Sequence, residues 1–275
     1  MKAVCGICPR RCSLGEGQLG FCRARINRGG KVICENYGRV TSLALDPIEK
    51  KPLHMFYPGV KILSVGSYGC NMDCGYCQNC DIARADSTST QWEAISPEAL
   101  VTLAEGYRPQ GNIGLAFTYN EPLVGYEFVL DCAKLAKPRG LKIVLVTNGM
   151  IESEPWERLL PFIDAANIDL KAFSQAGYRT LGGNLDTVKA AIVQAQGKIH
   201  LELTTLIVPG LNDDNESIRA EAAWIASVSS GIPLHLSRFF PRHRMRDALA
   251  TPLETVLRLA KVAREHLPYV FTGNL

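Results

Sequence analysis

Three cysteines in one short loop, Cys70, Cys74 and Cys77, have the side-chain type and spacing needed to hold an iron–sulfur cluster. Their C-x3-C-x2-C pattern follows an apolar run that ends at Gly66. Three thiolates can ligate three irons of a cubane [4Fe–4S] cluster and leave the fourth iron open to a non-protein ligand. Structural zinc, an electron-carrying cluster and redox thiols are the competing interpretations. An open fourth iron requires that Cys80, which follows closely, is not a ligand.

A second group of cysteines lies near the N-terminus, with the spacing C-x2-C-x3-C-x9-C: Cys5, Cys8, Cys12 and Cys22. Four thiolates satisfy a closed tetrahedral zinc site, and the same set could hold an auxiliary iron–sulfur cluster. The spacing does not separate these two metals, and unmetallated thiols are the third interpretation. Cys34 is left over, and Cys132 lies between apolar residues and is predicted to be a buried core thiol.

The composition limits the class of protein. The chain has 275 residues and a net charge of +3, which is too weak to indicate a nucleic-acid partner. Nine of its ten cysteines fall in the first 80 residues, whereas disulfides that stabilise a fold would be spread along it. No secretory signal follows Met1, and no apolar run is long enough to span a membrane. We therefore expect a cytoplasmic protein with no membrane partner, in which clustered cysteines are metal or redox ligands.

The elements that must position these cysteines follow from hydrophobic patterning. Residues 1–58 are rich in Cys, Arg and Gly and show little periodicity, so they are predicted to form a metal-binding extension, with the core at residues 59–275. In the core, short apolar runs alternate with helical periodicity, which predicts a parallel α/β sheet. An open doubly wound sheet and a full or partial barrel both fit. The runs are Lys61–Val65, Ile113–Phe117, Leu141–Val146, Ala165–Asp169, His200–Val208 and Leu234–Phe239, with a further strand at Tyr269–Thr272.

Three helices have recognisable starts in the sequence. Ser96–Glu98 supplies an N-cap followed by proline at the first helical position. Asp213–Glu216 is a variant of the capping box, and Thr251–Glu254 is a complete capping box.

Polar side chains follow several strands, at the edge where a parallel α/β sheet binds its ligands. Thr147 and Asn148 suit hydrogen bonds to a ribose or a carboxylate, although Asn-Gly is also a common turn. Asp169 and Lys171 lie on one face of their strand and could grip a zwitterionic ligand, whereas a surface ion pair is the simpler interpretation. The next strand has an apolar end at Val208 that could pack on a ring of a ligand, although a strand ending at Pro-Gly is the simpler interpretation.

With these features together, the chain resembles the radical S-adenosylmethionine (SAM) superfamily. The aromatic Tyr76 before the third cysteine matches that family's pattern, and Asn120-Glu121-Pro122 keeps the last part of its Gly-Gly-Glu-Pro-like turn. In the family this turn receives the SAM ammonium. The resemblance implies a partial (β/α)6 TIM-like barrel, in which Cys70, Cys74 and Cys77 hold the cluster and SAM chelates its open iron.

The resemblance is closer to two subgroups. Thr147–Gly149, Asp169–Lys171 and Val208–Gly210 are similar to the pattern of glycyl-radical activases such as pyruvate formate-lyase activating enzyme. The radical SAM members of the AmmeMemoRadiSam system match over nearly the whole chain. That family usually has an aromatic residue where Cys80 stands, and its longer members carry a further cysteine-bearing tail. The matching segments are Cys5–Cys12, Gly20–Cys22, Asp46–Leu53, Phe117–Pro122 and Ser237–Pro241.

The resemblance implies a function and partners. An external donor of the flavodoxin or ferredoxin type reduces the cluster, and SAM is cleaved to a 5′-deoxyadenosyl radical that abstracts hydrogen. An activase would take the hydrogen from a protein substrate. A small molecule or RNA is the alternative substrate, and a non-catalytic iron–sulfur or zinc protein is the alternative function. The basic loop Arg238–Arg246 is a candidate contact for an anionic substrate or a partner protein, and four histidines are predicted to be structural: His54, His200, His235 and His266.

Overall fold

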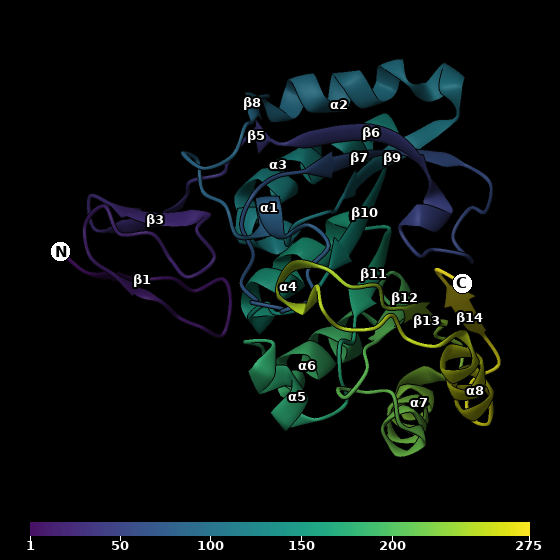
Figure 1. Ribbon diagram of the computed structural model, residues 1–275. Coiled ribbons are helices and arrows are strands. Elements are labelled where there is room, and N and C mark those ends of the chain that lie inside the picture. Colours follow the sequence, from purple (N-terminus) through teal and green to yellow (C-terminus); the bar gives the residue numbers. More distant parts are fainter.

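The computed structural model describes residues 1–275, and an eight-stranded sheet forms its centre (Figure 1). Seven of the strands run parallel to one another, and β6 joins the edge of the sheet antiparallel to β7. In spatial order the strands are β14 (Val270–Gly273), β13 (Leu234–Arg238), β12 (His200–Ile207), β11 (Ala165–Asp169), β10 (Lys142–Thr147), β9 (Asn112–Phe117), β7 (Lys61–Gly66) and β6 (Ser42–Pro47). Every predicted strand is present, with bounds that differ by one residue at most.

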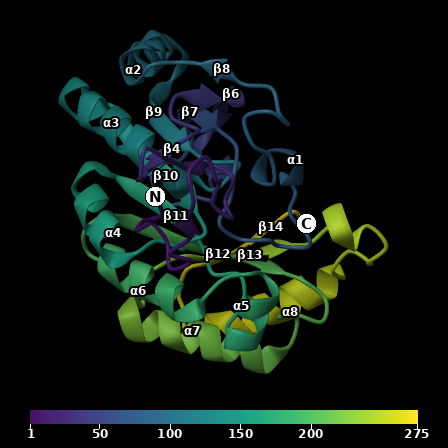
Figure 2. The ribbon, with the colours of Figure 1, turned by 90° about the vertical axis from the view of Figure 1, so that its left-hand side faces the viewer.

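Helices cover the outer face of this sheet, and the strands form an open arc inside them (Figure 2). Because β6 and β14 are unpaired edges, the sheet does not close. The fold is therefore the predicted partial barrel of the α/β class. The helices are α1 (Cys80–Ala83), α2 (Pro97–Gly106), α3 (Tyr126–Ala136), α4 (Ser153–Leu159), α5 (Gln175–Thr180), α6 (Leu185–Ala195), α7 (Asn215–Ser229) and α8 (Leu253–Arg264). None of these helices has the length and apolar character needed to cross a membrane.

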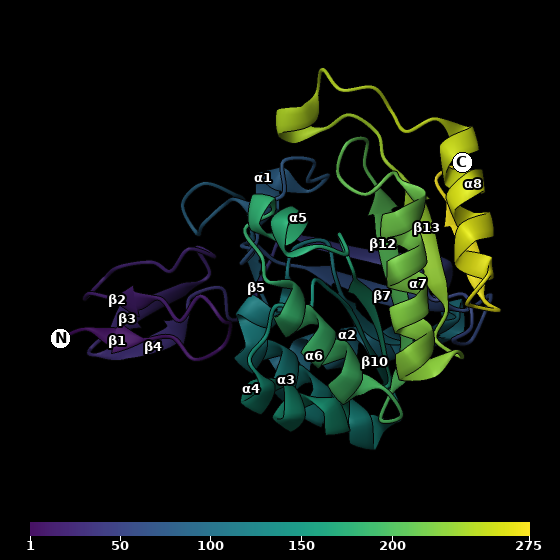
Figure 3. The same ribbon diagram turned by 90° about the horizontal axis from the view of Figure 1, so that it is seen from below.

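The N-terminal residues form a small module beside the barrel (Figures 1 and 3). It contains two antiparallel pairs, β1 (Ala3–Val4) with β2 (Ser13–Leu14) and β3 (Arg25–Arg28) with β4 (Lys31–Cys34). A third pair, β5 (Arg39–Val40) with β8 (Glu93–Ala94), leads back to the main sheet. The division at residue 58 stays a prediction, but residues 42–47 on its N-terminal side form β6 and so belong to the barrel sheet.

The helix starts agree with the sequence in part. The Ser96 hydroxyl caps α2, and Pro97 is its first residue, as predicted. The side chain that caps α7 belongs to Asp214, one residue beyond the predicted Asp213. The predicted capping box at Thr251 is wrong, because its hydroxyl donates to the carbonyl oxygen of Ile207 at 2.6 Å and α8 has no side-chain cap.

One buried carboxylate closes the amino-terminal end of the barrel. Glu202 on β12 is fully buried and accepts hydrogen bonds from the backbone amides of His54 (3.0 Å) and Met55 (2.8 Å). Its oxygens also lie 2.8 Å from Nε2 of His200 and 2.6 Å from Nε2 of His235. Burial opposes ionisation, but these hydrogen bonds lower the pKa of Glu202 to about 2. Glu202 therefore anchors the loop between β6 and β7 beneath the barrel.

A second buried carboxyl, Glu221 on α7, has no such set of donors. Burial raises the pKa of Glu221 to about 8, and its Oε2 has no partner. The neighbouring Thr205 hydroxyl donates its single proton to the carbonyl oxygen of Leu170 at 2.9 Å. The close contact between Glu221 and Thr205 is then best made by a protonated carboxyl group that donates to the hydroxyl oxygen. We infer that Glu221 is neutral at pH 7.

A Glu221→Gln variant should therefore change how stability depends on pH. The folded protein favours the protonated carboxyl, so this contribution is complete below the unfolded pKa and is lost as pH rises through the folded value of about 8. Between pH 6 and pH 8 the wild type should lose roughly 2 kcal/mol of unfolding free energy relative to the variant. Denaturant unfolding at both pH values measures this difference. Equal pH dependence of the unfolding free energy in the wild type and Glu221→Gln would contradict a neutral Glu221. The exposed Glu216→Gln is the control, and the same difference from the wild type there would also contradict it.

Candidate active site

A cavity of about 750 Å³ crosses the carboxyl ends of the parallel strands. Its walls come from the cysteine loop after β7, from the ends of the following strands, and from the segment after β6. The cavity reaches the gap between the edge strands, because its lining includes the last residue of each one, Pro47 of β6 and Gly273 of β14. This volume is typical of sites for small ligands and cofactors.

The structure brings most of the predicted site residues to this cavity: Cys70, Cys74, Tyr76, Cys77, Asn120, Glu121, Asn148, Asp169 and Lys171. Thr147 and Val208 do not line it. Cys80 begins α1, lies outside the cavity and places its Sγ 3.7 Å from the carboxylate of Asp81. The three cysteines of the C-x3-C-x2-C motif therefore share one chamber without the fourth.

The cysteine loop is fixed against the N-terminal module. Gly69 has φ +91°, and a Cβ at this position would lie 2.5 Å from the carbonyl oxygen of Cys22, so glycine is required there. That carbonyl accepts a hydrogen bond from the amide of Cys70 at 3.2 Å. The Sγ of Cys70 lies 3.7 Å from Nδ2 of Asn148, which also donates to Asn71 Oδ1 at 2.9 Å. Contacts with Cys22 of the N-terminal module and with Asn148 after β10 therefore both hold the loop in place.

The donor set in this loop fits a cubane cluster better than a single metal ion. Zinc bonds each sulfur at about 2.3 Å, which places the sulfurs of one site about 3.8 Å apart. No three His, Cys, Asp or Glu ligands anywhere in the chain are arranged for a single ion. Burial raises the pKa of Cys70 and Cys77, and raises the pKa of Cys74 to about 11 against the opposing charge of Lys171. Cluster binding must therefore displace protons from these thiols.

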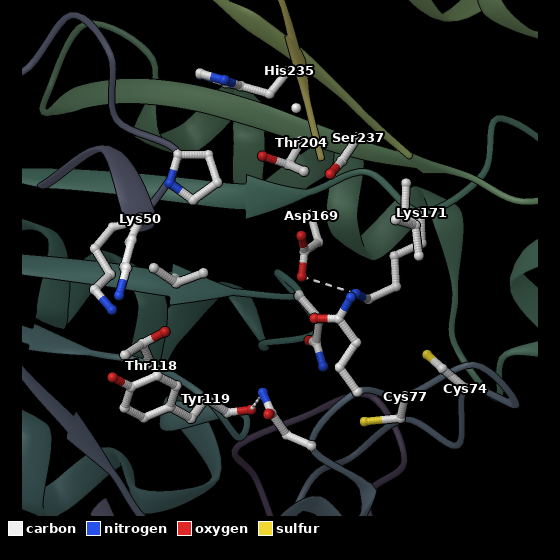
Figure 4. A pocket seen from close by; sticks show the side chains of 18 of the residues that line it. Lys50, Cys74, Cys77, Thr118, Tyr119, Asp169, Lys171, Thr204, His235 and Ser237 are labelled. Atoms are coloured by element: carbon white, nitrogen blue, oxygen red, sulfur yellow. Dashed lines mark hydrogen bonds and ion pairs between the residues drawn. The ribbon is translucent and has the colours of Figure 1, made fainter. Parts of the chain in front are cut away.

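An ion pair stands beside the cysteines. Nζ of Lys171 lies 2.8 Å from Oδ2 of Asp169, and both side chains project into the cavity from the end of β11 (Figure 4). Burial favours the neutral amine, but Asp169 and Cys74 raise the pKa of Lys171 well above its usual value. Lys171 is therefore a cation at neutral pH. The pair offers a positive and a negative group to one ligand, which suits the carboxylate and ammonium of an amino acid.

The side chains of Glu121 and Thr147 bond to each other within the site. Glu121 is 2% exposed, and its carboxylate accepts hydrogen bonds from the Thr147 hydroxyl (2.6 Å), the Asn148 amide (2.7 Å) and the Leu123 amide (3.0 Å). These bonds tie the turn after β9 to the end of β10. Burial raises the pKa of Glu121 to about 7 against these donors. The Thr147 hydroxyl is therefore committed to Glu121 rather than directed at a ligand.

Val208 also departs from the prediction. Strand pairing ends at Ile207, and the Val208 amide donates to Oδ1 of Asn212 at 2.8 Å in the turn that follows. Its side chain is buried in the main hydrophobic core, whereas Leu206 lines the cavity. The apolar wall at the end of β12 is therefore Leu206.

A polar cluster that was not predicted from the sequence lies on the β6 side of the cavity. Asp46 accepts hydrogen bonds from Nζ of Lys50 (3.2 Å), Nζ of Lys51 (2.9 Å) and the Tyr119 hydroxyl (2.7 Å). Burial opposes the charge on Asp46, but Lys51 and Tyr119 hold its pKa well below the usual range. Tyr119 has φ +74°, a strained value for tyrosine. Figure 4 shows Lys50 and Tyr119 across the cavity from Cys74.

Two of the four histidines predicted to be structural, His54 and His235, line the cavity, as do Thr204 and Ser237. The alternation of side chains along the strands predicts that three of these residues face the inside of the barrel. His235 and Ser237 alternate along β13, and Thr204 faces the same side on β12, so each points into the barrel. His54 carries no such signal, because only the loop anchored by Glu202 brings it there.

The basic loop after β13 lies over the cysteine loop (Figure 3). Arg244 donates to the Asp73 carboxylate at 3.0 Å and to the Asp73 carbonyl oxygen at 2.6 Å. The amide of Arg244 also donates to the carbonyl oxygen of Gly75 at 2.9 Å. No residue of Arg238–Arg246 lines the cavity, so the geometry does not support a contact with a substrate bound inside it.

Comparison with known proteins gives consistent findings. The family model described as the radical SAM superfamily matches residues 64–222. An uncharacterized protein of Methanocaldococcus jannaschii is 39% identical over 280 residues, covering 100% of this chain and 82% of that protein. The pyruvate formate-lyase-activating enzyme of Clostridium pasteurianum is 26% identical over 227 residues, covering 76% of this chain and 92% of that enzyme.

Solved structures share the fold. The structure of QueE from Escherichia coli has a TM-score of 0.55 and 14% sequence identity, and the match covers 86% of this chain and 93% of that one. A radical SAM methyltransferase from Sphaerobacter thermophilus has a TM-score of 0.56 at 16% identity, covering 79% of this chain and 67% of that one.

Proposed function

The chain belongs to the radical SAM superfamily, and on that premise we propose that it is an activase-like enzyme that removes a hydrogen atom from a glycine of a partner protein. Radical SAM enzymes use a [4Fe–4S] cluster and SAM, and these are the cofactors of this chain. Bound together, they supply a 5′-deoxyadenosyl radical by one-electron cleavage of SAM to methionine.

The residues assigned to these cofactors all line the one cavity. In this proposal Cys70, Cys74 and Cys77 hold the cluster. Asp169 and Lys171 bind the charged groups of the methionine part of SAM, because their paired charges complement a zwitterion. Other cavity groups have unused hydrogen-bonding capacity, including the buried Tyr76 hydroxyl, which has no protein partner. A substrate segment seated in the open side of the barrel would exclude water from a reactive radical.

The activase assignment rests on the similarity to pyruvate formate-lyase-activating enzyme along three quarters of the chain. The shape of the site supports it. The cavity reaches the gap between the unpaired edges β6 and β14, and a glycine on an extended segment of another protein could enter there. Glycine suits such an approach because it has no side chain to obstruct the abstracted Cα hydrogen.

Isotope transfer tests the glycine substrate. Reconstituted protein is incubated with SAM, dithionite and a native-cell extract whose proteins carry α-deuterated glycine. Abstraction from glycine should place deuterium in 5′-deoxyadenosine, measured by mass spectrometry. An extract labelled with α-deuterated alanine is the matched control and should give unlabelled product. Unlabelled 5′-deoxyadenosine from both extracts would overturn the activase assignment and indicate a small-molecule or RNA substrate.

The electron donor is the second partner in this proposal. Arg244 and Arg84 both pair with Asp73 in the cysteine loop, at 3.0 Å and 3.5 Å, and Arg242 and Arg246 are exposed close by. This positive surface over the cysteine loop favours an acidic one-electron carrier of the flavodoxin or ferredoxin type.

Ionic strength distinguishes this donor from a neutral one. Raising salt from 50 to 500 mM should slow SAM cleavage driven by an acidic flavodoxin roughly 10-fold, because screening weakens the attraction between exposed charges. The rate with dithionite serves as the control for effects on the enzyme itself. Equal salt dependence of both rates would contradict an electrostatic docking surface.

A further inference from the structure

The four N-terminal cysteines line a second, small cavity beside the barrel, together with two arginines, Arg10 and Arg25. Cys5, Cys8 and Cys22 are buried, and Cys12 is half-buried. Two turns bring them together. In these turns the Arg11 amide donates to the carbonyl oxygen of Cys8 at 3.1 Å, and the Arg23 amide donates to that of Gly20 at 2.8 Å. The Cys5 amide also donates to the carbonyl oxygen of Cys12 at 3.0 Å. The fifth cysteine of the N-terminal segment, Cys34, does not line this cavity, and neither does Cys132.

The module around this cavity has almost no hydrophobic core of its own. The buried apolar cluster at its centre contains three residues: Cys22, Ala24 and, from the barrel, Val124. Its strands β1 and β2 are two residues long. A segment with so little buried apolar surface requires a cross-link or a metal to hold one structure. All ten cysteines are free thiols, so no disulfide supplies it.

Arg25 provides an independent sign that something is bound in the cavity. It is 4% exposed, and its terminal nitrogens donate to Glu127 on α3 at 2.7 and 2.6 Å and to the Val124 carbonyl oxygen at 3.2 Å. Its Nε is buried with no hydrogen-bond partner. A buried N–H without an acceptor is costly, and charged donors cost more than neutral ones. The cavity that Arg25 lines therefore lacks an acceptor.

We propose that Cys5, Cys8, Cys12 and Cys22 hold a second metal centre and that Arg25 donates its Nε–H to one of the metal-bound thiolates. Because no three such ligands in the chain are arranged for a single ion, the metal group that this donor set fits is an iron–sulfur cluster. Four thiolates around a [4Fe–4S]²⁺ core carry a net charge of −2, which the cations of Arg25 and Arg10 offset. Glu127 fixes the guanidinium, so the Arg25–Glu127 pair fastens the centre to α3. Arg25 is a positioning residue for this centre.

The second metal centre would also fix the position of the loop that carries Cys70, Cys74 and Cys77. The Cys22 carbonyl oxygen accepts the hydrogen bond from the Cys70 amide, and no other residue intervenes between these two cysteines. Anchoring Cys22 to a metal therefore fixes the peptide that carries the first cysteine of the C-x3-C-x2-C motif.

Metal analysis tests the site separately from catalysis. The full chain with Cys70→Ala, Cys74→Ala and Cys77→Ala together is purified without oxygen, so that metal at the catalytic loop does not contribute. We expect about four irons with sulfide per chain. Adding Cys8→Ser and Cys12→Ser should remove that metal, whereas adding Cys34→Ser should not. Absence of metal from the triple variant, or full retention after Cys8→Ser and Cys12→Ser, would overturn the site.

A second measurement tests Arg25. In the same triple background, Arg25→Lys keeps the charge but removes Nε, and should speed metal release to a chelator by 10- to 100-fold, the usual effect of losing a group that hydrogen-bonds a metal ligand. Arg28→Lys, exposed on the same strand, is the control. Glu127→Gln leaves Arg25 in place but weakens its anchoring, and should give a smaller acceleration. Wild-type release rates in both Arg25→Lys and Glu127→Gln would overturn the role of Arg25.

Discussion

A Cys74→Ala variant should form no 5′-deoxyadenosine above background when it is reduced in the presence of SAM, a loss of at least about 10³-fold. The physical reason is the number of thiolate ligands that the cluster needs. Three thiolates, from Cys70, Cys74 and Cys77, are the minimum that holds a cubane with one iron open, and the cavity offers no fourth cysteine as a replacement. Chromatographic measurement of 5′-deoxyadenosine after anaerobic reconstitution gives the result. Iron content should fall in parallel.

Cys80→Ser is the matched control. Cys80 lies three residues beyond the motif but outside the cavity, at the start of α1, where its thiol contacts Asp81. The variant should keep wild-type cleavage, because Cys80 does not face the cluster site. If Cys80→Ser lost iron and activity while Cys74→Ala kept both, the cluster would have a different ligand set and the radical assignment would be wrong.

Lys171→Met should weaken SAM binding by 30-fold or more. The pair is half-buried on its own and would be covered by bound SAM. Removing one partner of a hydrogen-bonded charge pair that a ligand covers costs about 2–5 kcal/mol, because the other charge is left without compensation. Here Asp169 would remain in the cavity as an unpaired carboxylate and would repel the carboxylate of SAM. The Kd for SAM, measured by equilibrium dialysis on the reconstituted oxidised protein, checks this expectation without depending on turnover.

A similar ion pair on the same strands provides the control. Nζ of Lys142 on β10 lies 2.9 Å from Oδ1 of Asp164, just before β11, but this pair lies at the opposite end of the strands from the cavity. Lys142→Met should leave the Kd for SAM unchanged. Equal weakening in the two variants would mean that the effect of Lys171→Met is structural, and an unchanged Kd for Lys171→Met would exclude the pair from SAM binding.

Most of the architecture could be predicted from the sequence because the signals are local. Apolar runs alternating with amphipathic helices reflect burial of each element on its own, and they located all seven parallel strands. The convergence of Asn148, Asp169 and Lys171 on one cavity could also be predicted, since parallel strands place their carboxyl ends at one edge. The cysteine motif lies within eight residues, so its chemistry does not depend on distant contacts.

The other features of the site depend on contacts between residues that are far apart in the chain. Thr147 was predicted to contact a ligand, but its hydroxyl donates a hydrogen bond to Glu121. Thr251 was predicted to cap α8, but its hydroxyl donates to the carbonyl oxygen of Ile207. In both cases the side-chain type permits several bonds, and only the packed neighbours determine which one forms. Lys50 and Lys51, the partners of Asp46, reach the cavity because β6 pairs antiparallel with β7, a pairing that periodicity alone does not specify.

The sequence by itself therefore determined the order of the elements, the three-cysteine motif and the edge of the sheet where the chemistry lies. Local burial and short-range spacing are enough to encode these. Only the tertiary structure decided that Cys80 lies outside the cavity, that His54 and His235 line it, and that Arg25 faces the four N-terminal cysteines without an acceptor. Those facts arise from contacts between residues that are distant in sequence, and such contacts leave no periodic signal along the chain.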